Sequence, residues 1–155
     1  MPSLHFIYAS TSGHTEYVVD IVERYIREHG EGISVERQRA EQAKPEDLLR
    51  GDVLILGSGT WNTGGMEGQL NMHMHKLLTE QAATIDLHKK PITFISLGDE
   101  RYYFRTRCTE HFLRFQREHN GVLLLPPLVL VNEPYEQEAK IRTWSEKLMW
   151  AMNNG

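Results

Sequence analysis

Residues 4–26, LHFIYASTSGHTEYVVDIVERYI, place a short apolar run, a loop of small residues and an amphipathic helix in direct succession. The run Leu4–Ala9 is rich in residues that favour β-strands. After the loop, apolar residues recur at the spacing of one helix face, namely Val18, Val22, Tyr25 and Ile26. The stretch therefore predicts a strand that is followed directly by a helix.

The same alternation of strand and helix continues along the chain. Apolar or alternating runs predict further strands at residues 33–39, 53–57, 91–97 and 122–131. Pro45 predicts the first turn of a short helix that ends near Gly51. Stripes at helical spacing predict longer helices, with Met66, Leu70, Met74, Leu77 and Leu78 in one, Phe104, Cys108, Phe112 and Phe115 in the next, and Ile141, Trp144, Leu148 and Met152 in the last.

Five such units with mostly apolar strands predict an α/β fold. The expected architecture is a doubly wound, five-stranded parallel sheet with helices on both faces. Right-handed crossovers leave few topologies, and strand order 2-1-3-4-5 is one common solution. In that order ligands bind beyond the carboxyl ends of strands 1, 3 and 4. These strand ends are therefore where a functional site is expected.

Composition excludes several classes of protein. The 155 residues are 25% charged and 40% hydrophobic, which predicts one globular domain over residues 1–155. The net charge of −4 gives no electrostatic reason to bind nucleic acid or an anionic membrane. The single cysteine cannot form an intramolecular disulfide, and the sequence shows neither a signal peptide nor a membrane-spanning run. We expect a soluble, cytoplasmic monomer.

The loop after the first strand reads Ser10-Thr11-Ser12-Gly13-His14-Thr15 and leads straight into a helix. Free backbone N–H groups, the helix dipole and hydroxyl donors converge at such a place, which suits an anion. The loop lacks the lysine of the nucleotide triphosphate motif GxxxxGK[ST], so it suits one terminal phosphate held by neutral donors. Taken alone, the segment is explained equally well by a plain helix N-cap with a turn glycine.

Aromatic residues follow the third and fourth predicted strands. The third is followed by Ser58-Gly59-Thr60-Trp61-Asn62-Thr63-Gly64-Gly65, and the fourth ends in Leu97-Gly98-Asp99-Glu100-Arg101-Tyr102-Tyr103. A loop aromatic can present a flat face to a ring system, although Trp61 alone is better explained as folding back onto the core. Together, a phosphate loop and two aromatic faces predict a site for a flat heterocycle that bears one phosphate.

With these three loops, the sequence resembles the flavodoxin family over nearly the whole chain. The first loop matches the family's [ST]-x-[ST]-G-x-T phosphate loop, and the other two resemble the loops that cover the two faces of the isoalloxazine ring. No large insertion interrupts the fifth strand, as in short-chain members. The resemblance implies the flavodoxin-like fold, a non-covalently bound FMN, and low-potential electron transfer rather than catalysis by an enzyme.

The resemblance also implies a role for each loop. The first would bind the FMN phosphate, and Ser58 and Thr60 would lie near the ribityl chain. Trp61 would stack on the ring, the Asn62 carbonyl would accept a hydrogen bond from protonated N5, and Asp99 would bind the pyrimidine edge. Tyr102 is the preferred second stacking residue and Tyr103 the alternative. The full set of candidate FMN-binding residues is Ser10, Thr11, Ser12, Gly13, His14, Thr15, Ser58, Gly59, Thr60, Trp61, Asn62, Thr63, Gly64, Leu97, Gly98, Asp99, Tyr102 and Tyr103.

The partners implied are a flavodoxin reductase as electron donor and an acceptor enzyme. Arg101, Arg105 and Arg107 follow the third loop, where many flavodoxins carry acids, which argues against the usual docking on a basic reductase. Two alternatives share the fold: an FMN-dependent NAD(P)H:quinone or nitro-compound reductase, and a flavodoxin-like activator of a metalloenzyme such as ribonucleotide reductase. A phosphoacceptor receiver domain is excluded, because acids are missing after the first strand and at the end of the third.

Other conspicuous side chains favour structural roles. His73 and His75 stand two apart on a predicted helix and cannot share one metal ion, so we expect surface histidines and no metal site. Cys108 lies in an aromatic stripe and is predicted to be buried rather than nucleophilic. Trp144 and Leu148 are predicted core residues, and Trp150 a peripheral one.

Overall fold

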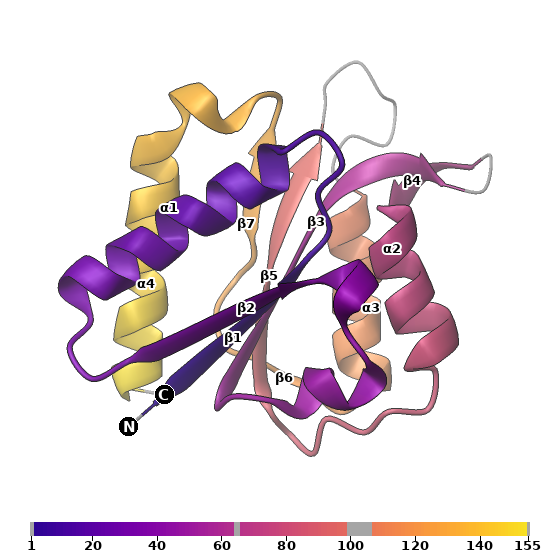
Figure 1. The fold of residues 1–155 in the computed structure, drawn as a ribbon, viewed down its shortest axis with the longest axis horizontal. Coiled ribbons are helices and arrows are strands. Elements are labelled where there is room, and N and C mark those ends of the chain that lie inside the picture. The colour runs from indigo at the N-terminus through magenta and orange to yellow at the C-terminus, as the bar shows by residue number, and fades with distance from the viewer. Residues whose placement is uncertain (1, 64–65, 99–106, 155) are drawn as a thin grey trace.

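The structure is a computed structural model that describes residues 2–63, 66–98 and 107–154, without the side chains of residues 61–63 and 66–67. Its centre is a parallel sheet in the order β2-β1-β3-β5-β6 (Figure 1). The strands are β1 (Ser3–Tyr8), β2 (Ser34–Arg39), β3 (Val53–Thr63), β4 (Met66–Leu70), β5 (Pro91–Gly98), β6 (Val122–Leu123) and β7 (Leu128–Val131). The predicted doubly wound sheet is confirmed, because β6 and β7 together take the place of its fifth strand.

Helices cover both faces of this sheet. One face carries α1 (His14–His29) and α4 (Glu138–Asn154), and the other carries α2 (Met72–His75) and α3 (Cys108–Glu118) (Figure 1). The π-helical segment η3 (Lys76–Gln81) continues α2. Short 3-10 turns are η1 (Ala40–Gln42), η2 (Pro45–Leu49) and η4 (Pro134–Glu136). This two-sided covering explains why the central strands are apolar along nearly their whole length.

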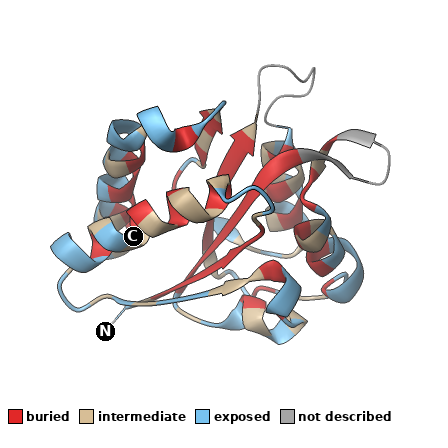
Figure 2. Ribbon diagram, turned by 45° about the horizontal axis from the view of Figure 1, so that its top comes forward, coloured by how far each residue is buried: buried red, intermediate tan, exposed pale blue. Residues whose placement is uncertain are grey.

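The core consists of two clusters, one on each face of the sheet. Side chains of α1 and α4 pack on β1, β3 and β5 in the first cluster. The second joins α2, η3 and α3 to the opposite face, where the rings of Phe94 and Phe112 stack at 4.8 Å. Figure 2 shows the central strands buried and the outer surfaces of the helices exposed. Trp144 and Leu148 belong to this core and Trp150 is 68% exposed, as predicted.

The segment after β3 differs from the prediction. A loop was expected from Ser58 and a helix from Met66, but β3 continues to Thr63 and residues 66–70 form the antiparallel strand β4 beside it. Met66 and Leu70 are four residues apart, a spacing that suits a helix stripe equally well. Gly68 has a φ of +81°, outside the helical region, and the helix begins only at Met72.

The predicted fifth strand, Val122–Val131, is divided into two pieces. β6 and β7 both pair in parallel with β5, and Pro126 and Pro127 lie between them. Proline has no backbone N–H and cannot donate to a strand ladder, so the pairing is interrupted there. The Thr93 hydroxyl bridges the gap by donating to the Leu125 carbonyl at 2.9 Å.

Candidate functional site

The carboxyl ends of β1, β3 and β5 meet at one edge of the sheet (Figure 1). Strand β1 pairs with β3 as far as Tyr8 opposite Gly57, and the Ala9 N–H donates to the Gly57 carbonyl at 2.9 Å. Strand β3 pairs with β5 as far as Gly59 opposite Leu97. The sheet thus brings the starts of the three predicted site loops to neighbouring positions.

The first loop ends at the N-terminus of α1. Gly13 is the residue before the helix and has a φ of +92°, a conformation that residues with a Cβ rarely adopt. Thr11, Ser12 and Gly13 are exposed, and the Ser10 hydroxyl accepts a hydrogen bond from the Glu16 N–H at 3.3 Å. The N–H groups of a helix's first turn have no partner within the helix. The exposed loop can therefore offer backbone and hydroxyl donors to an anion.

The first turn of α1 packs directly on β3. Thr15 is buried, and a Cβ on Gly57 would lie only 3.2 Å from its Cγ2 atom. The glycine thus leaves room for the first helical turn to pack on the strand. This contact fixes the position of the helix N-terminus relative to the sheet.

An arginine at the end of β2 holds the outer side of the first loop. One guanidinium nitrogen of Arg39 donates to the Ser10 carbonyl at 3.2 Å, and another lies 2.5 Å from a Glu16 carboxylate oxygen. The Tyr8 hydroxyl donates to the same carboxylate at 2.9 Å, and the Arg39 guanidinium lies 5.5 Å from the centre of the Tyr8 ring. Burial, followed by the neighbouring Glu16, raises the pKa of Tyr8, so its phenol remains a donor.

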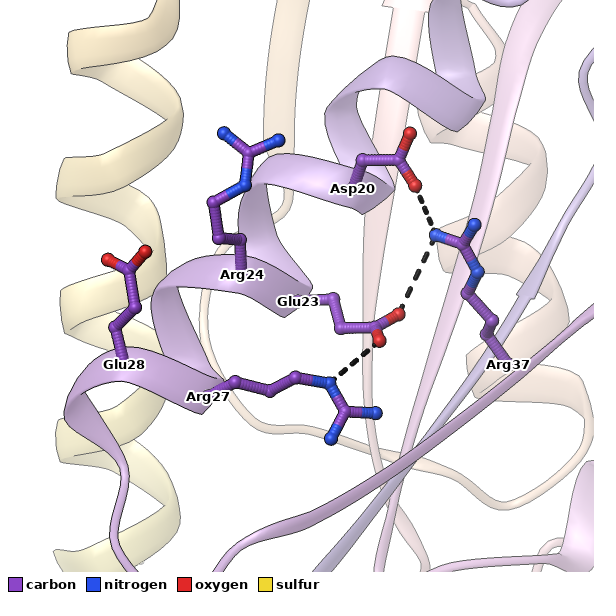
Figure 3. A pocket seen from close by; sticks show the side chains of 6 residues that line it. All are labelled: Asp20, Glu23, Arg24, Arg27, Glu28 and Arg37. Atoms are coloured by element: carbon purple, nitrogen blue, oxygen red, sulfur yellow. Dashed lines mark hydrogen bonds and ion pairs between the residues drawn. The ribbon is translucent and has the colours of Figure 1, made fainter.

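Further ion pairs continue from this arginine along α1. Arg37 bonds to Asp20 and lies 3.6 Å from Glu23, which also pairs with Arg27 at 2.9 Å (Figure 3). Residues 37 and 39 of β2 share one face of the strand, and they meet acids on successive turns of the helix. The charged cleft in Figure 3 is therefore a contact between an edge strand and a helix, and it does not resemble a ring-binding pocket.

The hydroxyls of Ser58 and Thr60 are buried and point to internal partners. Ser58 donates to the Gly59 carbonyl at 2.8 Å and accepts from the Asn71 N–H at 3.0 Å. Thr60 donates to the Leu97 carbonyl at 3.0 Å and accepts from the Cys108 N–H at 3.4 Å. These bonds join the ends of β3 and β5 to the starts of α2 and α3.

Cys108 lies directly beneath these strand ends. Its sulfur is 3.7 Å from both the Ser58 and the Leu97 carbonyl oxygens, and the residue is fully buried, as predicted. Burial raises the pKa of the Cys108 thiol to about 11. The group is therefore a protonated, weak donor inside the protein and does not act as a nucleophile at neutral pH.

Known proteins resemble this chain in sequence over most of its length. The sequence model of the flavodoxin family matches residues 6–144. The chain belongs to the flavodoxin family. A flavodoxin of Nitratidesulfovibrio vulgaris (strain Miyazaki F) is 34% identical over 98% of this chain and 100% of its own. A probable flavodoxin 2 of Bacillus subtilis is 26% identical over 89% of this chain and 87% of its own.

Solved flavodoxin structures share the fold. Oxidised flavodoxin 1 from Bacillus cereus has a TM-score of 0.82 at 23% identity, covering 94% of this chain and 95% of its own. Flavodoxin 2 of the same organism gives 0.81 over 98% of both chains. Family membership makes this chain an electron-transfer flavoprotein. None of the helices in its described part is long and apolar enough to cross a membrane.

The structure brings part of the predicted flavin site of this flavodoxin together. The first loop, the end of β3 from Ser58 to Thr60, and the end of β5 at Leu97 and Gly98 are adjacent. The backbone of Trp61, Asn62 and Thr63 lies in β3, but their side chains are outside what the structure describes. Other candidates lie outside the described residues altogether, namely Gly64, Asp99, Tyr102 and Tyr103.

Three residues near this site were missed by the sequence analysis. Arg39 and Asn71 contact the first loop, and Tyr135 packs edge-on against His14 and Tyr17, with ring centres 5.4 and 4.8 Å away. Only Asn71 carries a local signal, because asparagine is a preferred residue directly before a helix. No group of three potential metal ligands occurs in the described part of this flavodoxin, and His73 and His75 are half-buried.

Proposed function

We propose that this chain binds one FMN non-covalently and carries electrons at low potential between a flavodoxin reductase and an acceptor enzyme. The observation that supports this most directly is the exposed loop 11–13, with its positive-φ glycine, at the start of α1 beside the ends of β3 and β5. A helix N-terminus of this kind binds phosphate groups. When bound, FMN supplies the redox chemistry, and the protein sets its position and surroundings.

The residues around this loop fit a flavin phosphate. The hydroxyls of Thr11 and Ser12 are on exposed residues, and Gly13, His14 and Thr15 contribute backbone N–H groups at the positive end of the helix dipole. The loop itself carries no lysine, but Arg39 lies against its outer side and adds a positive charge. In the proposed site, Trp61 and Tyr102 form the two walls for the ring, with Tyr103 as the alternative.

Internal hydrogen bonds make the base of this site rigid. Because the hydroxyls of Ser58 and Thr60 have internal partners, the ends of β3 and β5 are fixed before any ligand arrives. A preorganised site loses less conformational entropy on binding. We propose that Ser58 and Thr60 shape the floor beneath the ribityl chain, and that the backbone beyond Thr60 contacts the ring.

We further propose that the chain acts as a single, monomeric, cytoplasmic domain that carries electrons without catalysing a reaction of its own. A reducing compartment suits its single buried cysteine. The electron-carrier assignment predicts that the purified protein alone does not oxidise NAD(P)H, and that it accepts electrons once a flavodoxin reductase is added.

The deciding experiment is the absorption spectrum of the purified protein together with chromatographic identification of any released flavin. Recombinant protein is also titrated with FMN, whose fluorescence is quenched by stacking on an aromatic side chain. We expect a yellow protein with bound FMN, or colourless protein that quenches added FMN at one equivalent. Protein that is colourless and leaves the fluorescence of added FMN unchanged would contradict the proposal. Steady-state NAD(P)H oxidation without a reductase would indicate a quinone or nitro-compound reductase instead.

A further inference from the structure

Asn71 lies between β4 and α2, is 1% exposed, and connects three parts of the candidate site. Its side-chain Nδ2 donates to the Thr11 hydroxyl oxygen at 2.9 Å, across 60 residues of sequence. Its backbone N–H donates to the Ser58 hydroxyl at 3.0 Å. Its side-chain oxygen accepts from the His73 N–H at 2.9 Å and thereby caps α2. One buried residue thus joins the first loop, through its side chain, to the end of β3, through its backbone.

These contacts fix the orientation of the Asn71 amide. The cap on the His73 N–H requires an acceptor, so the oxygen must face the helix and the NH₂ group must face Thr11. The NH₂ group can only donate, so the Thr11 oxygen is the acceptor in this bond. Within the described part of the chain, the Thr11 hydroxyl donates to no other group.

The polarity of this bond leaves the Thr11 proton available on an exposed residue of the first loop. A hydroxyl that already accepts a hydrogen bond is also a better donor, because bonds in a chain polarise one another. A phosphate oxygen is an acceptor and matches such a proton. The buried amide therefore prepares Thr11 to donate outward.

We propose that Asn71 is a positioning residue of the phosphate loop, which holds Thr11 so that its hydroxyl donates to the phosphate of FMN. This inference rests on the proposed function. Asn71 itself does not touch the ligand. Its effect is confined to the phosphate, so replacing Asn71 should weaken the binding of FMN but not that of riboflavin, which has the same ring and ribityl chain without the phosphate.

Two substitutions separate positioning from helix capping. Asn71→Ser retains a good N-cap for α2 but is too short to reach Thr11. Asn71→Asp retains the cap and the reach, but its carboxylate can only accept, so the Thr11 hydroxyl would donate to the carboxylate instead of to the phosphate, and a negative charge is added near the phosphate. We expect Kd for FMN to weaken about tenfold in the serine variant and more strongly in the aspartate variant. Kd for riboflavin should change by less than about twofold in both.

Substitutions at Thr11 provide the matched controls. Thr11→Val removes the hydroxyl and should reproduce the FMN-selective loss, whereas Thr11→Ser keeps a hydroxyl and should lose less FMN affinity than Thr11→Val. In the Thr11→Val background, Asn71→Ser should cost FMN binding little more, because the group it positions is already missing. Near-native circular dichroism and melting temperature confirm that each variant is folded. Thr11→Val carries the test if the Asn71 variants do not fold.

These experiments distinguish a failure of the proposed function from a failure of the role proposed for Asn71. If the unaltered chain does not bind FMN, the proposed function fails. If it does bind, but the Asn71 variants lose FMN and riboflavin affinity in equal proportion, or lose neither, Asn71 has only a structural role and the inference is wrong. An aspartate variant that binds FMN as well as the serine variant would equally contradict the proposed donor direction.

Discussion

Arg39 both carries a positive charge beside the first loop and holds that loop by a hydrogen bond. It bonds to the Ser10 carbonyl and to Glu16, and its side chain is 34% exposed. We predict that Arg39→Gln weakens FMN binding about threefold to tenfold, because a partly screened positive charge near the phosphate and one loop contact are lost. Riboflavin binding should change less. Fluorescence titration with both flavins, at low and high salt, measures the effect.

Arg27 provides the control for this prediction. It pairs with Glu23 on the same helix but is 56% exposed, contacts no part of the first loop, and should leave the FMN affinity unchanged when replaced by glutamine. A similar loss of FMN affinity in both variants would show that Arg39 acts only through net charge. Salt should reduce the difference between unaltered protein and Arg39→Gln, because screening weakens the attraction that the variant lacks.

His5 makes stability depend on pH. The residue is buried in β1, and burial, opposed by the hydrogen bond from its ring to Gln38, lowers its pKa below the ordinary 6.5. Nearby Arg50 lowers the pKa further, while Glu36 and Asp47 raise it. The unfolded chain therefore binds a proton more readily than the folded one. The contribution of His5 to stability is complete above the unfolded pKa and is lost as the pH falls below it.

We predict that His5→Gln, which cannot titrate, makes the free energy of unfolding less dependent on pH between 7.5 and about 5. The difference in slope between the two proteins cannot exceed about 1.4 kcal/mol per pH unit, the value for one proton. Urea unfolding of both proteins over this range gives the measurement. Parallel curves for the two proteins would show that His5 titrates alike in the folded and unfolded chains.

The sequence predicts single residues well where an apolar environment decides their place. Cys108 and Trp144 occur in stripes at helical spacing, and both are buried in the structure as predicted. Arg39 and Asn71 were not predicted, because their loop partners lie 29 and 60 residues away in sequence. A contact between polar residues that are distant in sequence produces no periodic pattern in that sequence, so it can be identified only in the folded structure.

At the scale of elements, the hairpin of β3 and β4 shows why the prediction failed after Gly57. The spacing of Met66 and Leu70 fits a helix, but strand pairing with the end of β3 determines the outcome. Such pairing is a tertiary effect that overrides local propensity. The helix that was expected from Met66 instead starts after Asn71, whose buried amide both caps it and reaches the first loop.

The contact between α1 and β3 is a second test at this scale. We predict that Gly57→Ala lowers the free energy of unfolding by about 1 kcal/mol, because the added methyl group would lie 3.2 Å from Thr15 Cγ2 and overpack a filled contact. It should also weaken FMN binding, because the added methyl group would displace the first turn of α1, whose N–H groups are proposed to bind the phosphate. Urea unfolding and FMN titration measure the two effects.

A compensating substitution distinguishes this contact from a general effect on β3. Thr15→Ser removes the methyl group that the new Cβ would touch and keeps the hydroxyl. The Gly57→Ala, Thr15→Ser double variant should therefore recover part of the lost stability. Strictly additive losses in the double variant would mean that the damage arises from the Tyr8 or Ile95 side of the glycine, where the added Cβ would lie 3.5 and 3.6 Å away.

At the scale of the whole molecule, the order of the strands explains why the location of the site was predictable from sequence. Alternating strands and helices predict a parallel sheet, and its topology determines which strand ends meet. The structure confirms this, because the ends of β1, β3 and β5 are adjacent. The internal bonds of Ser58 and Thr60 were not predictable in the same way, because they depend on where α2 and α3 begin.

The rate at which the Cys108 thiol is labelled measures how often the folded structure around it opens. Its sulfur is 3.7 Å from the carbonyl oxygens of both Ser58 in β3 and Leu97 in β5, so a reagent can reach it only when the packing between α3 and these strand ends opens. Its pKa of about 11 further suppresses the thiolate that reacts. We predict that labelling at pH 8 is slow in the native protein and accelerates with urea in parallel with global unfolding. Labelling that does not depend on urea would indicate a local opening near the start of α3.

FMN should protect this thiol without touching it. A ligand that binds only the folded state, at a hundred times its Kd, stabilises that state by about 2.7 kcal/mol, which slows labelling through global unfolding about a hundredfold. Riboflavin at the same multiple of its own Kd should protect equally, because the linkage depends on saturation and not on the phosphate. Protection by FMN that stays well below this value would mean that Cys108 becomes accessible while the flavin is still bound, and that the sheet edge opens independently of the site.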